Sequence, residues 1–199
     1  MQLLVATRNA GKIRELAHML ADLEVDWLSL DDIEAVEEVA ETGSNFEQNA
    51  ILKANGYAVA SGLLTLADDS GLEVDALGGR PGVHTARYGG PELSPEQRYR
   101  RLLSELRHIP WDQRTARFRC VIAIANPDAL ISTAEGVCEG MIASEPRGEG
   151  GFGYDPVFYI PDRQQTMAEL PAEVKHQISH RGRAIAKIAP MLRQLSDIV

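Results

Sequence analysis

Cysteine and lysine are both scarce in this sequence of 199 residues. Its two cysteines, Cys120 and Cys138, lack the spacing of metal-ligand motifs, which excludes a zinc ribbon or a disulfide-rich scaffold. We expect both to be small core residues in a protein of the reducing cytoplasm. Only four of the twenty basic residues are lysines, and three of them, Lys12, Lys53 and Lys175, fall inside the motifs described below.

Long apolar runs and excess positive charge are also missing. No stretch approaches the roughly 18 to 20 apolar residues of a membrane span. The first twelve residues lack the basic and apolar regions of a signal peptide, so we expect a cytoplasmic protein with no membrane partner. The net charge of −9 argues against a nucleic-acid polymer as partner, because polyanions bind basic faces. A single nucleotide needs only a local cationic pocket.

What is present is the composition of an ordinary globular protein, with 44% hydrophobic and 25% charged residues. The length suits one domain over residues 1–199, folded as two lobes. Segments typical of strands and helices alternate, which predicts an α/β protein. The expected strands are 2–6, 62–67, 72–76, 117–125, 131–142 and 156–160, and the expected helices begin near residues 12, 44, 94 and 182.

Local signals mark the ends of these helices. Ser44 with Glu47, and Ser94 with Gln97, have the spacing of capping boxes. Pro190 should kink the last helix, expected over 182–195, or end it early. The irregular stretch 78–93 is either a surface loop or a lid over a site.

The loop 6–12 joins the first strand to the first helix. It resembles a Walker A loop, but it has alanine in place of the first glycine and Ile13 in place of the Ser/Thr, which excludes a P-loop kinase. Helix N-terminal amides together with Lys12 still form an anion site, with Thr7 and Asn9 as donors. A plain turn with a solvated lysine is an equal alternative.

Two adjacent aspartates, Asp68 and Asp69, follow the uncharged run 63–67, where we expect the strand to end. Two neighbouring like charges call for a cation. The alternative is that one aspartate caps the Ser-Gly turn that follows.

Two further segments offer groups for a nucleobase. The glycine-rich segment 146–156 carries Phe152 and Tyr154, which either stack on a ligand or lie in the core. His180 and Arg181 stand just before a predicted helix, where basic groups are electrostatically unfavourable. They either face solvent or are held by a ligand.

Six stretches, in order, resemble one family, the inosine/xanthosine triphosphate pyrophosphatases: "ATRNAGK", "ETGSNFEQNAILKA", "ADDSGLEVDALGGRPG", "ARY", "GGFGYDPVF" and "ISHRG". Together they cover nearly the whole chain. The loop fits the family pattern Ser/Thr-x-Asn-x-x-Lys through Thr7, Asn9 and Lys12, with Arg8 at a position often filled by glycine.

The resemblance implies an elongated α/β homodimer, with a long mixed β-sheet, flanking helices and a nucleotide cleft between two lobes. It also implies a reaction: Mg²⁺-dependent hydrolysis of dITP, ITP and XTP to the monophosphate and pyrophosphate. Water would attack the α-phosphorus, and the reaction would cleanse the nucleotide pool of deaminated purines.

Residue roles follow from the resemblance as well. It implies Mg²⁺ ligands at Glu41, Asp68 and Asp69, with Asp69 also accepting the proton of the attacking water. The nearby Glu34, Glu37 and Glu38 are interpreted as a solvated acidic face. The residues implied to bind substrate are Thr7, Arg8, Asn9, Ala10, Gly11, Lys12, Lys53, Ser70, Phe152, Gly153, Tyr154, Asp155, Lys175, His180 and Arg181.

Within that set the three lysines would neutralise the triphosphate and Phe152 would stack on the base, while Asp155, His180 and Arg181 would read its edge. Two other functions compete: a pyrophosphatase for damaged pyrimidine nucleotides, and a nucleotide-binding regulator without catalysis. Glu41 and Asp69 favour an enzyme, because a sensor needs no metal-bound water.

Overall fold

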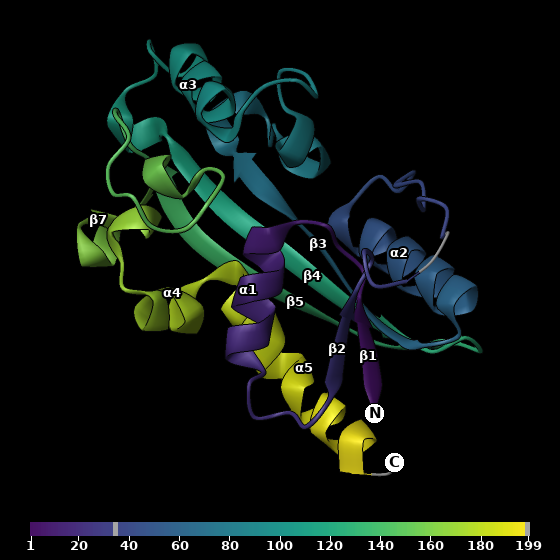
Figure 1. Cartoon of the computed structure of the whole chain (residues 1–199). Helices are drawn as coiled ribbons and strands as arrows, with labels where there is room; N and C mark the ends of the chain where they lie inside the picture. Colours follow the sequence, from purple (N-terminus) through teal and green to yellow (C-terminus); the bar gives the residue numbers. More distant parts are fainter. Residues whose placement is uncertain (34–35, 198–199) are drawn as a thin grey trace. The chain divides into compact units, whose positions relative to one another are not determined.

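The structure, a computed structural model, describes residues 1–33 and 36–197 (Figure 1). It is a mixed α/β fold, as predicted. Seven strands form one sheet in the order β2-β1-β3-β4-β5-β6-β7. The strands are β1 (Gln2–Val5), β2 (Asp26–Ser29), β3 (Leu64–Val74), β4 (Thr115–Ala125), β5 (Leu130–Ile142), β6 (Phe158–Ile160) and β7 (Gln165–Thr166). The α-helices are α1 (Ala10–Met19), α2 (Phe46–Ser61), α3 (Pro95–Glu105), α4 (Ala172–Ile178) and α5 (His180–Asp197).

The sheet combines both strand directions. Strand β1 pairs in parallel with β2 and β3, whereas β6 pairs antiparallel with β5 and β7. Strands β4 and β5 are neighbours joined by the short link 126–129, as expected for the predicted hairpin.

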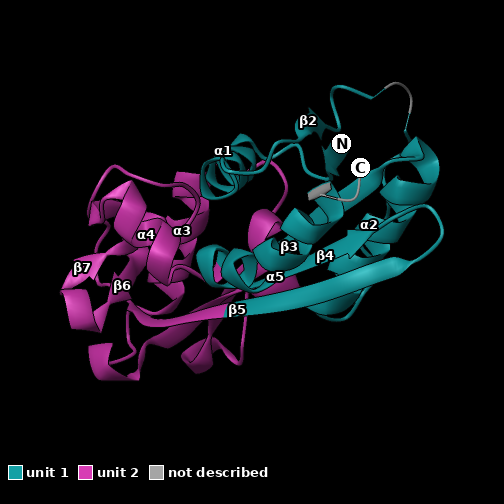
Figure 2. Cartoon of the chain, turned by 90° about the horizontal axis from the view of Figure 1, so that it is seen from below, with its two compact units in different colours: residues 1–69, 120–136, 181–199 teal, residues 70–119, 137–180 magenta. Residues whose placement is uncertain are grey.

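The chain divides into two compact units, coloured separately in Figure 2. Unit 1 comprises residues 1–69, 120–136 and 181–199, and unit 2 comprises residues 70–119 and 137–180. Strands β3, β4 and β5 therefore each contribute residues to both units. The single domain of the sequence analysis stays a prediction.

The core of unit 1 lies on one face of its part of the sheet. Leu3 and Val5 of β1 join this cluster together with residues of α1 and α5, whereas Leu4 is buried outside it. Successive strand residues point to opposite faces, so Leu4 lies on the other face. Helix α2 gives none of its buried side chains to the cluster, and Figure 1 draws it on the other side of β1 from α1 and α5.

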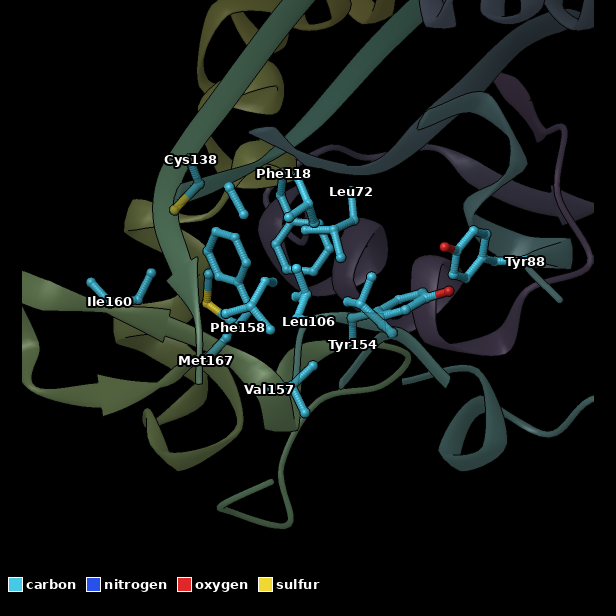
Figure 3. Close-up of a cluster of buried hydrophobic side chains, with 14 of the residues drawn as sticks. Leu72, Tyr88, Leu106, Phe118, Cys138, Tyr154, Val157, Phe158, Ile160 and Met167 are labelled. Atoms are coloured by element: carbon cyan, nitrogen blue, oxygen red, sulfur yellow. The ribbon is translucent and has the colours of Figure 1, made fainter. Parts of the chain in front are cut away.

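Unit 2 has its own apolar cluster, shown in Figure 3. Two tyrosines belong to it, and each hydroxyl has a partner: Tyr88 donates to Glu105 (2.7 Å), and Tyr154 donates to the carbonyl of Thr85 (3.1 Å). The hydroxyl of Thr85 accepts from the amide of Leu72 (2.9 Å). The irregular stretch 78–93 is therefore bonded to both α3 and β3, and its role as a lid stays a prediction.

Three local predictions need correction. Helix α2 is capped by Asn45, whose side chain accepts from the amide of Gln48, and not by Ser44. The hydroxyl of Ser44 instead bonds to the side chain of Gln48. Helix α5 begins at His180 and runs through Pro190, so the proline does not end it early, and the kink expected as the alternative stays a prediction.

The third correction concerns the two strands expected at 62–67 and 72–76, which are one continuous strand, β3. Other local predictions are confirmed. Ser94 caps α3 with a full capping box, Cys120 and Cys138 are buried and unbonded to each other, and Glu37 and Glu38 are exposed. Glu34 lies outside the described residues.

Candidate functional site

The two aspartates lie inside a strand and not at its end, and this decides what each of them meets. Because successive side chains of β3 point to opposite faces, Asp68 and Asp69 are directed to different sides of the sheet. Asp68 points to the face of α1 and α5, and Asp69 points to the face of α2, as their partners show. No Ser-Gly turn follows them, so neither caps one. The like charges are separated by the pleat.

Asp68 is the centre of a buried cluster of charges. Its Oδ2 accepts from Nε of Arg181 (2.8 Å) and from Sγ of Cys120 (3.0 Å), while its Oδ1 accepts from Nζ of Lys12. The guanidinium of Arg181 is also paired through Nη1 with Glu15 on α1 (2.6 Å). The carboxylate of Asp68 is fully buried, and the side chain of Arg181 is only 2% exposed.

The electrostatics of this cluster are dominated by burial and by close opposite charges. Burial alone would raise the pKa of Asp68, but the charges of Arg181 and Lys12 outweigh it and hold this pKa well below the usual value. Burial would likewise lower the pKa of Arg181, yet Asp68 and Glu15 raise it further above the ordinary value. Both groups are therefore ionised at neutral pH.

Asp69 occupies a different environment. Its Oδ1 accepts from Nζ of Lys53 (2.9 Å), and the same ammonium donates to Oε1 of Glu41 (2.9 Å) and to the carbonyl of Asp68 (2.9 Å). Its Oδ2 is buried and has no hydrogen-bond partner among residues 1–33 and 36–197. Burial raises the pKa of Asp69 although Lys53 opposes the shift.

This arrangement suits a divalent cation that keeps part of its water shell. Within the described part of the chain, no three His, Cys, Asp or Glu side chains gather into a complete metal cage. Mg²⁺ does not need one, since it is commonly held by one or two carboxylates plus waters and substrate phosphates. A buried carboxylate oxygen without a partner is costly unless a cation or donor reaches it. Among the described residues Asp69 has such an oxygen, and Glu41 contacts the same Lys53 ammonium as Asp69. These two carboxylates therefore suit a partly hydrated divalent cation.

The loop before α1 is organised by its own side chains. Asn9 is the N-cap, and its Oδ1 accepts from the amides of Gly11 (2.9 Å) and Lys12 (3.3 Å). Thr7 accepts from the amide of Asn9 (3.1 Å), and Arg8 is paired with Asp31 at the surface (3.3 Å). Lys12 is not solvated but turned toward Asp68. The solvated-lysine alternative is therefore wrong.

The residues implied to bind the base belong mainly to unit 2, where a second buried ion pair forms. Lys175 on α4 donates to Oδ2 of Asp155 (2.6 Å), which also accepts from the amide of Phe152 (2.8 Å). The ammonium of Lys175 lies 5.0 Å from the centre of the Phe152 ring. Gly151 is required at its position, because a Cβ there would lie 2.0 Å from Oδ2 of Asp155 and its φ is +72°. The three side chains form one compact group.

The remaining predicted residues are placed individually. His180 stacks on Phe118 with ring centres 4.7 Å apart, and Tyr154 is buried in the core of unit 2. Ser70 lies within β3, Ala10 is the first residue of α1, and Gly153 has a φ of +63°. His180 and Arg181 are in the first turn of α5 and not before it. The implied substrate residues thus fall into a set in unit 1 and a set in unit 2.

Two members of the Asp68 cluster, Glu15 and Cys120, are not among the residues predicted from the sequence. Glu15 had a signal: it lies next to Leu16 on the buried side of α1, where an unpaired carboxylate is unfavourable. Cys120 had none, since a thiol in a central strand is an ordinary core residue.

The comparisons with known proteins agree with this architecture. The model of the Ham1 family matches residues 3–191. A dITP/XTP pyrophosphatase of Geobacillus kaustophilus is 52% identical over 187 residues, which cover 94% of this chain and 92% of that protein. The Ham1 protein of Staphylococcus aureus is 40% identical with a TM-score of 0.86, over 98% of this chain and all of that one. A HAM1 protein of Coxiella burnetii is 42% identical with a TM-score of 0.83, over all of this chain and 98% of that one.

Proposed function

The chain belongs to the Ham1 family, and on that premise we propose that it is a nucleoside-triphosphate pyrophosphatase. Its substrates are the deaminated purine nucleotides dITP, ITP and XTP, which it hydrolyses to the monophosphate and pyrophosphate with Mg²⁺ as cofactor. The relatives named dITP/XTP pyrophosphatase, which align over nearly their whole length, support this assignment.

The observation that carries the proposal is the environment of Asp69. One oxygen is fixed by Lys53, and the other is buried without a partner in the described part of the chain. A carboxylate of this kind is available for a cation and for a proton.

We assign the roles as follows. Glu41 and Asp69 would hold the metal, which supplies positive charge to the phosphates and lowers the pKa of water. Asp69 accepts the proton of the water that attacks the α-phosphorus. Lys53 orients both carboxylates through its two 2.9 Å bonds, and Lys12, held on Asp68, neutralises the phosphates.

Asp68 has a different task in this scheme. Both of its oxygens accept from neighbouring side chains, so it contributes by fixing Lys12 and Arg181. Direct ligation of the metal by Asp68, which the resemblance implies, stays a prediction. The two aspartates would then divide the work, with Asp68 holding protein cations and Asp69 serving the reaction.

Base selection would rest on hydrogen-bond polarity. Hypoxanthine and xanthine present an acceptor oxygen at position 6, where adenine presents a donor. Donors from Arg181 and His180 would pair with that oxygen, and Phe152 would stack on the ring beside Asp155. A site that reads a polar group can reject analogues lacking it by about 10⁴-fold. Arg181 also forms buried ion pairs with Asp68 and Glu15, and these compete with base recognition. The variant Arg181→Met distinguishes the structural role from base recognition.

A cytoplasmic homodimer is proposed from the family resemblance. No helix among residues 1–33 and 36–197 has the length and apolar character needed to cross a bilayer. The net charge of −9 is consistent with nucleotides and not nucleic-acid polymers as ligands.

The test is pyrophosphate release across a panel of nucleoside triphosphates, with and without Mg²⁺. We expect dITP, ITP and XTP to be hydrolysed far faster than ATP, GTP or pyrimidine triphosphates, and only with the metal. Asp69→Asn should reduce turnover by more than about 10²- to 10⁴-fold, because it removes a metal ligand and the base together. Asp22→Asn, which changes an exposed carboxylate paired with Arg193 outside the implied site, is the matched control.

Different outcomes would favour the competing functions. Preference for a modified pyrimidine triphosphate would indicate the damaged-pyrimidine enzyme. Tight binding of ITP without release of pyrophosphate would indicate the regulator. Near-normal turnover by a folded Asp69→Asn protein would refute the role of Asp69.

A further inference from the structure

The segment that carries Glu41 is attached to α2 by a regular series of contacts. Three polar residues of α2, Asn49, Lys53 and Tyr57, are spaced four residues apart and therefore lie on one stripe of the helix. All three are buried, with 1%, 8% and 4% of their surface exposed. Apolar side chains are the usual occupants of such a stripe, so three buried polar ones call for an explanation.

Each member of the stripe bonds one point of the segment 39–43. The hydroxyl of Tyr57 accepts from the amide of Val39 (3.2 Å), and Nζ of Lys53 donates to Oε1 of Glu41 (2.9 Å). Oδ1 of Asn49 accepts from the amide of Gly43 (2.7 Å). Residues 39, 41 and 43 of the segment are thus bound by residues 57, 53 and 49 of the helix. The segment therefore runs in the opposite direction to α2.

Glycines allow the close approach of helix and segment. A Cβ on Gly43 would lie 2.6 Å from Oδ1 of Asn49, and a Cβ on Gly56 would lie 2.7 Å from the side chain of Val39. Both distances are too short for carbon, so larger residues would push the segment away from α2. A further bond, from the amide of Thr42 to the carbonyl of Ala40 (3.1 Å), tightens the chain around Glu41.

We propose that Asn49 and Tyr57 are positioning residues for Glu41, holding the backbone on both sides of it so that its carboxylate meets the metal beside Asp69. This inference rests on the proposed function, since it takes Glu41 as a metal ligand. The half-buried side chain of Glu41 would otherwise sample many rotamers, and fixing its backbone removes part of that freedom before the metal binds. Residues that orient metal ligands typically change affinity by about 10- to 100-fold when lost.

The test compares metal binding with turnover. Tyr57→Phe removes one hydroxyl with no change in ring volume, and Asn49→Leu removes the acceptor at nearly constant volume. Binding of Mn²⁺ alone to the whole chain is measured by electron paramagnetic resonance, and the Mg²⁺ concentration for half-maximal ITP hydrolysis is measured separately. Tyr88→Phe is the matched control, because it removes a buried tyrosine hydroxyl bond in unit 2.

We expect Tyr57→Phe to weaken Mn²⁺ binding by about 3- to 10-fold and to raise the Mg²⁺ requirement by the same factor, with kcat restored at saturating Mg²⁺. Asn49→Leu should do the same by about 10-fold or more, and Tyr88→Phe should change neither value. If Tyr57→Phe binds Mn²⁺ as the wild type does, or loses kcat at saturating Mg²⁺, the positioning role is wrong even if Asn49→Leu does not fold. A wild-type chain that hydrolyses ITP without any metal would instead overturn the proposed function, and this inference with it.

Discussion

Replacing Arg181 by methionine distinguishes its two possible roles. The structure places the guanidinium between two carboxylates of unit 1, with Nε on Asp68 (2.8 Å) and Nη1 on Glu15 (2.6 Å). The resemblance instead assigns the residue to the edge of the base. Methionine keeps much of the length and apolar volume of the arginine stem but removes all the charge.

The expected loss of folding stability in Arg181→Met follows from the burial of the two carboxylates. The side chains of Asp68 and Glu15 are 0% and 9% exposed, so the variant leaves two buried carboxylates without the guanidinium charge that they shared. Removing one partner of a buried ion pair costs about 3–5 kcal/mol, much of it from the charge left unpaired. For a chain of this length each kcal/mol lowers Tm by roughly 2–4 °C, so we expect a fall of roughly 6–20 °C.

The pH dependence has a definite sign. In the wild type the pKa of Asp68 is held well below its usual value, so its stabilising contribution is present above the unfolded pKa and is lost as pH falls through the folded one. In Arg181→Met the stabilising charge of the guanidinium is gone, and acidification neutralises the buried carboxylate of Asp68. The difference in stability between variant and wild type should therefore be largest near pH 7 and shrink toward pH 4.

The assay is urea denaturation at several pH values, combined with kcat/KM for ITP and ATP on the same samples. If the main role of Arg181 is its ion pair with Asp68, the kcat/KM values for ITP and ATP should fall by a similar factor. Adding Asp68→Asn to Arg181→Met should then recover part of the lost stability. A variant whose Tm stays within about 2 °C of the wild type at neutral pH would refute this reasoning. If the ITP-over-ATP ratio then collapses, Arg181 reads the base.

Two further predictions concern Asp69. Burial raises the pKa of Asp69, so its ionised form costs stability at neutral pH, but the same carboxylate raises the pKa of Lys53, so its removal takes an opposite charge away from a buried ammonium. Because these two effects oppose each other, Asp69→Asn should lower Tm at pH 7 by less than Arg181→Met does, and a larger fall in Tm would contradict this balance. The rate of ITP hydrolysis should rise from neutral to alkaline pH, because the attacking water must lose a proton to an ionised acceptor, and a pH–rate profile that peaks in acid would exclude this mechanism.

Much of the fold could be predicted from local signals. The capping box of Ser94 and Gln97 fixes the start of α3 within a few residues, and neither residue depends on distant partners. The capping choice at α2 could not be settled this way, because Ser44 and Asn45 are both good N-caps and stand side by side. The continuity of β3 was missed because adjacent aspartates are unusual inside a strand and become tolerable only when distant cations reach them.

The residues near Glu41 likewise combine one feature that the sequence predicts with one that it does not. The spacing of Asn49, Lys53 and Tyr57 is visible in the sequence and predicts a shared helix face. What they bind is not visible, because the segment 39–43 has no periodicity of its own and acquires its path only by packing on α2.

The sequence by itself determined that this chain is an α/β protein and that the two aspartates need positive charge, whereas the groups that carry its chemistry stay a prediction. Only the tertiary structure decided which cation each aspartate received. The pleat of β3 sends Asp68 to Arg181, 113 residues away in the chain, and Asp69 to Lys53 on α2. Ion pairs of such separation depend on the strand order and on the docking of helices to each face, which are set by the burial of whole apolar surfaces and not by any short motif.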